Sequence, residues 1–160
     1  MKSVYEHLTK QKGIYVAVKH KGASIDSLKK KLNITNPHED YHCTLIYSKQ
    51  YDNVEVNPKT TYNASVVGLH AFSDTFLVCV LDCPELVARH KELMSTYNLV
   101  YDYDEYIPHI TLSYDINKEE KFDKSVLELS KEDFKKQYGK ITVKLCCEYK
   151  EDLNEDYAKE

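Results

Sequence analysis

The chain has 160 residues, which fits one domain over residues 1–160, and its 42% hydrophobic content is enough to form a core. No apolar run is long enough to span a membrane, and residues 1–12 lack the pattern of a signal peptide, so we expect a cytoplasmic protein. The formal net charge of −4 argues against binding along a long nucleic acid but not against a small phosphorylated ligand.

The first part of the chain predicts a strand, a helix and a second strand. Residues 13–19 are nearly all apolar, which indicates a strand. Ser24 is a good N-cap for a helix over residues 25–32, where Ile and Leu recur at helical spacing. A loop around Pro37 leads into a strand over residues 42–47.

The middle of the chain predicts a hairpin and a longer helix. A polar loop over residues 48–59 precedes two strands, 60–72 and 75–82, which a tight turn joins. Pro84 opens a helix that extends to Tyr97 and carries one apolar stripe. The pattern therefore repeats the order of strand and helix seen at the start.

The last part of the chain begins with an acidic, tyrosine-rich loop. A strand over residues 109–114 follows, then a helix over residues 125–138 with a break near Ser130. Residues 140–149 alternate between apolar and polar side chains, which predicts a final strand. The last ten residues are acidic.

This order contains a duplication of one strand–helix–strand unit. Two such units pack naturally about a pseudo-two-fold axis, and the two remaining strands would widen each half. We therefore predict an α+β fold with two pseudo-symmetric antiparallel-sheet lobes and outer helices around a central cleft.

Each unit ends in the same phrase, His-x-Thr-Leu-x-Tyr. The two copies are His42-Cys43-Thr44-Leu45-Ile46-Tyr47 and His109-Ile110-Thr111-Leu112-Ser113-Tyr114. Strict alternation along a strand predicts that one face carries His42, Thr44 and Ile46 in the first copy and His109, Thr111 and Ser113 in the second. The tyrosines that end both copies are expected on the opposite, apolar face.

The repeat favours a functional site over a structural role. A single histidine on a strand is usually structural, but a buried polar pair is costly unless it is used, and here the pair occurs twice. One neutral and one protonated imidazole can act as base and acid, while two threonine hydroxyls hold a phosphate between them. The phrases contain no carboxylate, so we expect no metal ion and no other cofactor.

Five cysteines agree with an intracellular protein. They are odd in number and lie mostly in apolar runs, so we expect free buried thiols. The five are Cys43, Cys79, Cys83, Cys146 and Cys147.

The paired motifs resemble those of the 2H phosphoesterase superfamily. Its members include RNA 2′,3′-cyclic phosphodiesterases and 2′-5′ oligoadenylate phosphodiesterases, and the superfamily has a duplicated, bilobal fold. The resemblance covers most of the chain. It implies that His42, Thr44, His109 and Thr111 are catalytic and leaves open which histidine is the base.

A closer resemblance is to the bacteriophage anti-CBASS nucleases, through residues 13–18, residues 42–49 and the small size of the chain. This family destroys the cyclic oligonucleotide signals of bacterial CBASS immunity, so the resemblance implies a cyclic di- or trinucleotide such as 3′,3′-cGAMP as substrate. Tyr15 is a candidate for stacking on a base, and Glu151 for a hydrogen bond to a purine edge. The resemblance also implies a nucleotide contact at Tyr157.

Two other functions remain open at this stage. One is a 2H enzyme that acts on RNA ends, which the net negative charge disfavours. The other is a protein that sequesters cyclic nucleotides without cleaving them, which two complete His-x-Thr pairs disfavour because a binder needs no matched acid and base.

Overall fold

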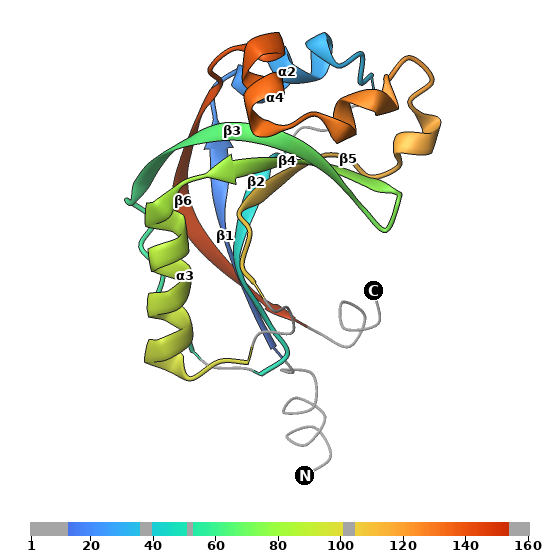
Figure 1. Cartoon of the computed structure of the whole chain (residues 1–160). Helices are drawn as coiled ribbons and strands as arrows, with labels where there is room; N and C mark the ends of the chain where they lie inside the picture. The colour runs from blue at the N-terminus through green and yellow to red at the C-terminus, as the bar shows by residue number, and fades with distance from the viewer. Residues whose placement is uncertain (1–12, 36–39, 51–52, 101–104, 154–160) are drawn as a thin grey trace.

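The computed structural model describes residues 13–35, 40–50, 53–100 and 105–153. The described strands are β1 (Gly13–Lys21), β2 (His42–Ser48), β3 (Thr61–Phe72), β4 (Phe76–Asp82), β5 (His109–Ser113) and β6 (Thr142–Leu153). The described helices are α2 (Ser24–Lys31), α3 (Pro84–Tyr97) and α4 (Lys131–Tyr138), with short 3₁₀ turns η1 (Ile116–Lys118) and η2 (Lys124–Glu128). Figure 1 shows α3 on one side of the curved sheet, well away from α2 and α4.

The six described strands pair antiparallel in the order β1-β2-β5-β4-β3-β6, and the pairing of β3 with β6 closes the sheet into a barrel. The ring of strands has a two-fold symmetry: if β1 is exchanged with β4, β2 with β5 and β6 with β3, every strand keeps the same kind of neighbours. The predicted α+β class is confirmed, and the strand–helix–strand order recurs as β1–α2–β2 and β4–α3–β5. The predicted arrangement of two lobes around a central cleft is not confirmed, because β3 and β6 join the halves edge to edge into one closed sheet.

Local sequence signals explain where the helices begin and end. Pro84 occupies the first turn of α3, and Asn98 ends the helix in the left-handed conformation that asparagine tolerates. The Ser130 hydroxyl accepts a hydrogen bond from the Asp133 amide and so caps α4. The predicted helix over residues 125–138 is accordingly broken at Ser130, with a 3₁₀ turn before the break.

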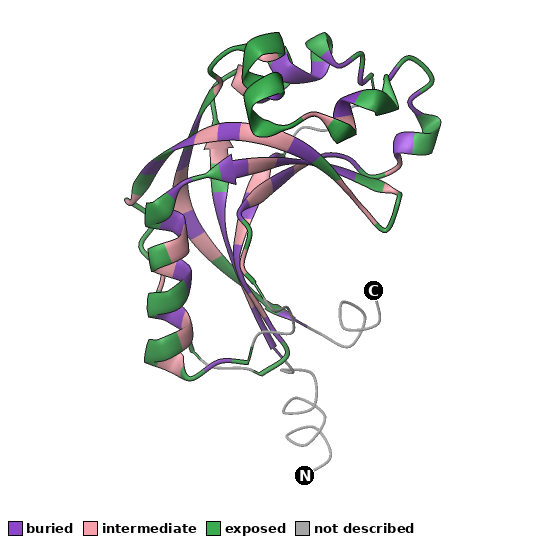
Figure 2. Cartoon of the chain, viewed as in Figure 1, coloured by how far each residue is buried: buried purple, intermediate pink, exposed green. Residues whose placement is uncertain are grey.

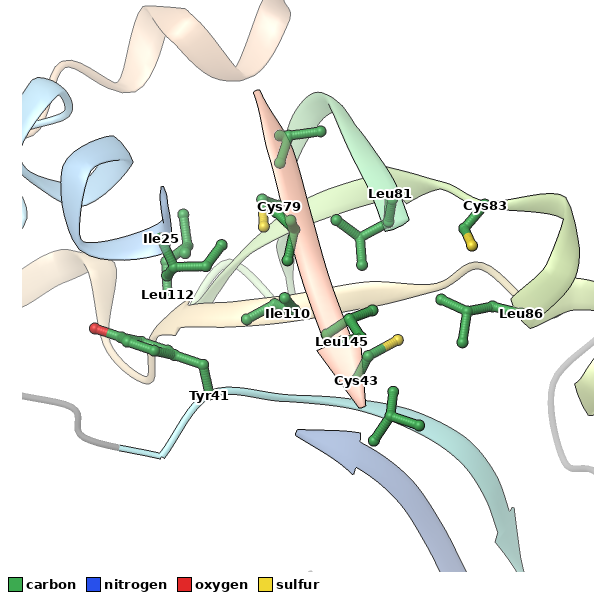
Figure 3. Packing of buried hydrophobic residues seen from close by; sticks show 14 of the residues in the cluster. Ile25, Tyr41, Cys43, Cys79, Leu81, Cys83, Leu86, Ile110, Leu112 and Leu145 are labelled. Carbon is green, nitrogen blue, oxygen red and sulfur yellow. The ribbon is translucent and has the colours of Figure 1, made fainter. Parts of the chain in front are cut away.

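The core lies on the side of the strands that faces the helices. Cys43 and Ile110, neighbours on β2 and β5, have no exposed surface, and Leu145 of β6 packs close to them (Figure 3). In the same view Leu86 of α3 borders this group, and Ile25 of α2 lies beside Leu112 of β5. Figure 2 shows the result: α3 turns buried residues toward the sheet and exposed residues away from it.

Three of the five cysteines are free and buried, as predicted: Cys43, Cys79 and Cys83. The prediction was wrong for Cys146 and Cys147, which form a disulfide with each other. These two residues are adjacent in sequence and lie where β6 shifts register against β1. Cys147 there has a φ of 67°, so the bulged backbone brings neighbouring side chains together.

A buried ion pair fastens α3 to β6. Arg89 is the only arginine of the chain, and its guanidinium donates two hydrogen bonds of 2.9 Å to the two carboxylate oxygens of Glu148. The Glu148 side chain has no exposed surface. It also accepts hydrogen bonds from the Tyr62 hydroxyl and the Asn57 amide, so its charge is fully paired.

We expect Glu148→Gln to lower the free energy of unfolding by about 2–3 kcal/mol, because the neutral amide removes the buried counter-charge of Arg89 and leaves its guanidinium paired only with the exposed Glu92. The matched control is Glu92→Gln, since Glu92 pairs with the same arginine but is 65% exposed. That variant should change stability by about 0.5 kcal/mol or less. Urea unfolding of both variants tests this, and equal losses would contradict it.

Candidate active site

The two His-x-Thr phrases lie side by side on β2 and β5. Cys43 pairs directly with Ile110 in antiparallel register. The flanking residues then also face each other, so His42 lies across from Thr111 and Thr44 across from His109. All four side chains are half-buried while Cys43 and Ile110 are fully buried. The structure thus brings the four predicted catalytic residues onto one face, opposite the core, which we call the His–Thr face.

The end of each phrase departs from the prediction. Along β2, Val16 pairs with Ile46 and the next residue, Ala17, pairs with Thr44, so Leu45 is an extra, bulged residue. Ile46 is consequently turned into the core, although strict alternation predicted it on the His–Thr face. Tyr47, predicted on the core face, instead lies across from Tyr15 on the His–Thr face.

The same bulge recurs in β5. Leu77 pairs with Ser113 and Val78 with Thr111, which leaves Leu112 as the extra residue. Ser113 is therefore buried rather than on the His–Thr face, and the ring of Tyr114 packs edge to face against Phe76. The prediction that Ser113 shares the face of His109 was wrong for the same physical reason as that for Ile46.

Each half of the His–Thr face ends in a group of residues that cross-strand pairing or ring contact brings together. We call the first group the Tyr15 end; it comprises Tyr47, Tyr15 and Glu151. We call the second group the Phe76 end; it comprises Tyr114, Phe76 and Phe72. The exchange of halves that preserves the strand order makes Tyr15 the counterpart of Phe76. Ala17 and Val78 correspond because each pairs with the threonine of its phrase, and Tyr15 and Phe76 each lie two residues earlier.

Tyr15 contacts the catalytic candidates directly. Its hydroxyl makes a 3.1 Å hydrogen bond with Oγ1 of Thr44, and its ring meets His42 edge to face at 6.1 Å. Burial raises the pKa of Tyr15, so its hydroxyl keeps its proton and orients the Thr44 hydroxyl. Glu151, the other candidate binding residue, lies across from Tyr15, while Tyr157 lies outside the described residues.

His109 is held in one tautomer. Its Nδ1 lies 2.8 Å from the carbonyl oxygen of Ile107, and because a carbonyl only accepts, Nδ1 carries the proton. In the neutral ring Nε2 is then free to accept a proton. Burial lowers the pKa of His109, and the charges of His42 and His70 lower it further, so the neutral form persists to lower pH.

Two residues from outside the phrases support the bulge at Leu45. The Tyr106 hydroxyl donates to the carbonyl of Thr44 at 2.7 Å, and Nδ1 of His90 donates to the carbonyl of Leu45, also at 2.7 Å. The rings of Tyr106 and His90 stack at 4.1 Å between centroids. They bind backbone carbonyls next to the bulge and so help to fix the direction of Thr44. His90 thus acts on the site only through the backbone.

Sequence reasoning missed several side chains of this face. Tyr149 pairs across from Ala17 and its ring lies 6.3 Å from that of Tyr15, while the charge of His70 helps to lower the pKa of His109. The repeated tyrosine at the end of each phrase was the one signal that could have revealed the aromatic ends. The bulges conceal it, because alternation assigns those tyrosines to the other face.

Two properties of the described part of the chain bear on cofactors and membranes. No three histidine, cysteine or acidic side chains in these ranges lie close enough together to hold a metal ion. Within the same ranges no helix has the length and apolar character needed to cross a bilayer.

The comparisons with known proteins agree with one another. A family model described as anti-CBASS protein Acb1 matches residues 12–160. The anti-CBASS protein Acb1 of Yersinia phage phiR1-RT is 32% identical over 154 residues, which cover 91% of this chain and 92% of the relative. The protein of the same name from Enterobacteria phage T4 is 32% identical over 156 residues, 91% of each chain. That of Vibrio phage KVP40 is 37% identical over 117 residues, 64% of this chain and 73% of the relative.

The environment of His109 predicts its titration. We expect its pKa below the ordinary imidazole value of about 6.5, with the proton of the neutral ring on Nδ1. Replacing His70 with glutamine removes a positive charge that disfavours protonation, so His70→Gln should raise the pKa of His109. Heteronuclear NMR of the imidazole nitrogens measures both quantities. A neutral ring protonated on Nε2, or a lower pKa in the variant, would contradict this assignment.

Proposed function

The chain belongs to the anti-CBASS protein Acb1 family, and from this membership we propose that it is a metal-independent phosphodiesterase of the 2H type. Its proposed substrates are cyclic di- or trinucleotide immune signals such as 3′,3′-cGAMP, whose 3′–5′ bonds it cleaves in the cytoplasm of the infected bacterium. The phage thereby evades CBASS defence. The anti-CBASS role follows from membership of the family. The cleavage reaction is our inference from the His–Thr face.

One observation carries the proposal: each histidine lies across from the threonine of the other phrase on the same face. Acid–base catalysis of phosphodiester cleavage needs two proton-transfer groups near one phosphate, one on each side of phosphorus. The two hydroxyls between them can donate hydrogen bonds to its non-bridging oxygens and stabilise the charge that develops there. A protein that only binds nucleotides has no need of this matched set.

The tautomer of His109 supports an assignment of roles. His109 is the general base: it stays neutral, and its Nε2 accepts the proton of the ribose 2′-hydroxyl. The 2′-oxygen forms a bond to phosphorus while the bond from phosphorus to the 5′-oxygen breaks. Protonated His42 then gives its proton to the departing 5′-oxygen. The products are an opened ring with a 2′,3′-cyclic phosphate end and a 5′-hydroxyl end.

The arrangement of the halves supports the 2H assignment as well. The strand order is unchanged when the halves are exchanged, and each half supplies one His-x-Thr phrase with its bulge at the same leucine. We accordingly propose that the two halves correspond to the two lobes of that superfamily. Liquid chromatography of 3′,3′-cGAMP and of a 2′,3′-cyclic mononucleotide after incubation with the protein tests the proposal. Cleavage of the mononucleotide alone would favour an RNA-end enzyme, and binding without cleavage a sequestering protein.

His42→Ala and His109→Ala should each reduce kcat by at least about 100-fold, the usual contribution of a positioned acid or base. Substrate affinity should fall much less, because the threonines and aromatic rings remain. The control is His20→Gln, since His20 lies on β1 with its side chain on the other side of the strand from Tyr15, Ala17 and Lys19. Assays in EDTA should give the same rates. A histidine whose alanine variant turns over at the wild-type rate is not catalytic.

A cyclic dinucleotide that lacks both 2′-hydroxyls should bind and remain intact. The nucleophile in our mechanism is the neighbouring 2′-oxygen, which the substrate itself holds within reach of phosphorus. With natural 3′,3′-cGAMP, a 2′,3′-cyclic phosphate end should be detected by mass spectrometry. Ready hydrolysis of the 2′-deoxy ring would mean that water attacks instead, and the role of His109 would have to be revised.

A further inference from the structure

Large apolar side chains that reach solvent are few in the described ranges, and two of them touch each other. Phe76 is 40% exposed and Tyr114 is 44% exposed, and their rings meet edge to face with centroids 5.9 Å apart. Tyr114 lies just beyond the end of β5 and Phe76 begins β4. Exposed aromatic surface that is gathered in one place is a feature of binding sites rather than of ordinary surface.

The Phe76 end is continuous with the catalytic candidates. Phe72 pairs across from Phe76, and its ring lies 5.1 Å from that of His109. His70, two residues earlier on β3, packs against Phe72 at 4.8 Å and lies across from Val78, the cross-strand partner of Thr111. An aromatic surface therefore extends from His109 to the outer edge of this half.

The Phe76 end is also the counterpart of the Tyr15 end. Under the exchange of halves, Tyr47 corresponds to Tyr114, Tyr15 to Phe76 and Glu151 to Phe72. Because β2 and β5 run antiparallel through the Cys43–Ile110 pair, the two ends extend in opposite directions from the four His and Thr residues. The face thus has a catalytic centre with an aromatic group on either side.

A cyclic dinucleotide has matching symmetry, since it carries one base on each side of a ring of two phosphates. We propose that Phe72, Phe76 and Tyr114 form a stacking subsite for the second base of the substrate, while the Tyr15 end receives the first. This inference rests on the proposed function, because it takes the substrate to be a cyclic oligonucleotide with its scissile phosphate at the threonines.

The chemistry of the two ends differs in a way that predicts specificity. The Tyr15 end contains the carboxylate of Glu151, which can accept hydrogen bonds from the edge of a base. The corresponding position at the Phe76 end is Phe72, which offers only a ring. Stacking on an aromatic face tolerates any base. The second subsite therefore holds its base without selecting it, and selection occurs at the other end.

Two exposed positions allow a test that does not disturb the core. Phe76→Ala and Tyr114→Ala should each raise Kd for the 2′-deoxy cyclic dinucleotide, and KM for 3′,3′-cGAMP, by about 5- to 150-fold, the usual effect of losing one base–aromatic stack. The kcat should change less than threefold, since neither residue touches the reacting atoms. Phe76→Tyr keeps a ring and should restore both constants. The control is Val100→Ala, which removes a 56% exposed apolar side chain outside the two ends.

The outcomes separate this inference from the proposed function. Wild-type cleavage of 3′,3′-cGAMP with unchanged KM and Kd in both alanine variants would overturn the second subsite and leave the enzyme assignment standing. A fall in kcat with unchanged KM would also overturn it, because the rings would then act on the reaction rather than on binding. If the wild-type protein neither binds nor cleaves the cyclic dinucleotide, both the function and the subsite are wrong.

Discussion

The structure depends on one contact, the meeting of β2 and β5 at Cys43 and Ile110. This pair is the only bridge between the two strands, and both side chains are fully buried in the core. Alternation along each strand then turns the four His and Thr side chains to the opposite face. The apolar pair beneath the sheet therefore determines the geometry of the polar group above it. A change that displaced either buried residue would alter the register of the two histidines and the two threonines together.

The bulges complete this arrangement. Without the extra residues Leu45 and Leu112, the side chains after each threonine would continue the alternation, and the tyrosines would point into the core. The bulges reverse this and turn both ends of the His–Thr face into aromatic groups. A bulge disrupts regular pairing, and at Leu45 the nearby carbonyls bond to His90 and Tyr106 instead. The irregular feature is thus anchored by side chains from elsewhere in the chain.

Local sequence signals were sufficient for most elements. Apolar alternation marked the strands, Pro84 and Ser130 marked helix ends, and the repeated phrase pointed to a duplication. Three features were beyond such signals because they depend on pairing between distant segments. They are the closure of the sheet by β3 and β6, the bulges, and the disulfide between Cys146 and Cys147. The bulges mattered most for the site, since they changed which face carries Ile46, Ser113 and the two tyrosines.

The ion pair between Arg89 and Glu148 has a consequence for ligand discrimination. The only guanidinium of the chain is bound to a buried carboxylate, so the His–Thr face has no planar guanidinium of the kind that binds phosphate through two hydrogen bonds in many nucleotide-binding proteins. The hydroxyls and imidazoles of this face contact a phosphate through single hydrogen bonds and lack the paired donors of a guanidinium. Under the proposed function, linear triphosphates would then compete poorly with a compact ring that carries only one charge per phosphate.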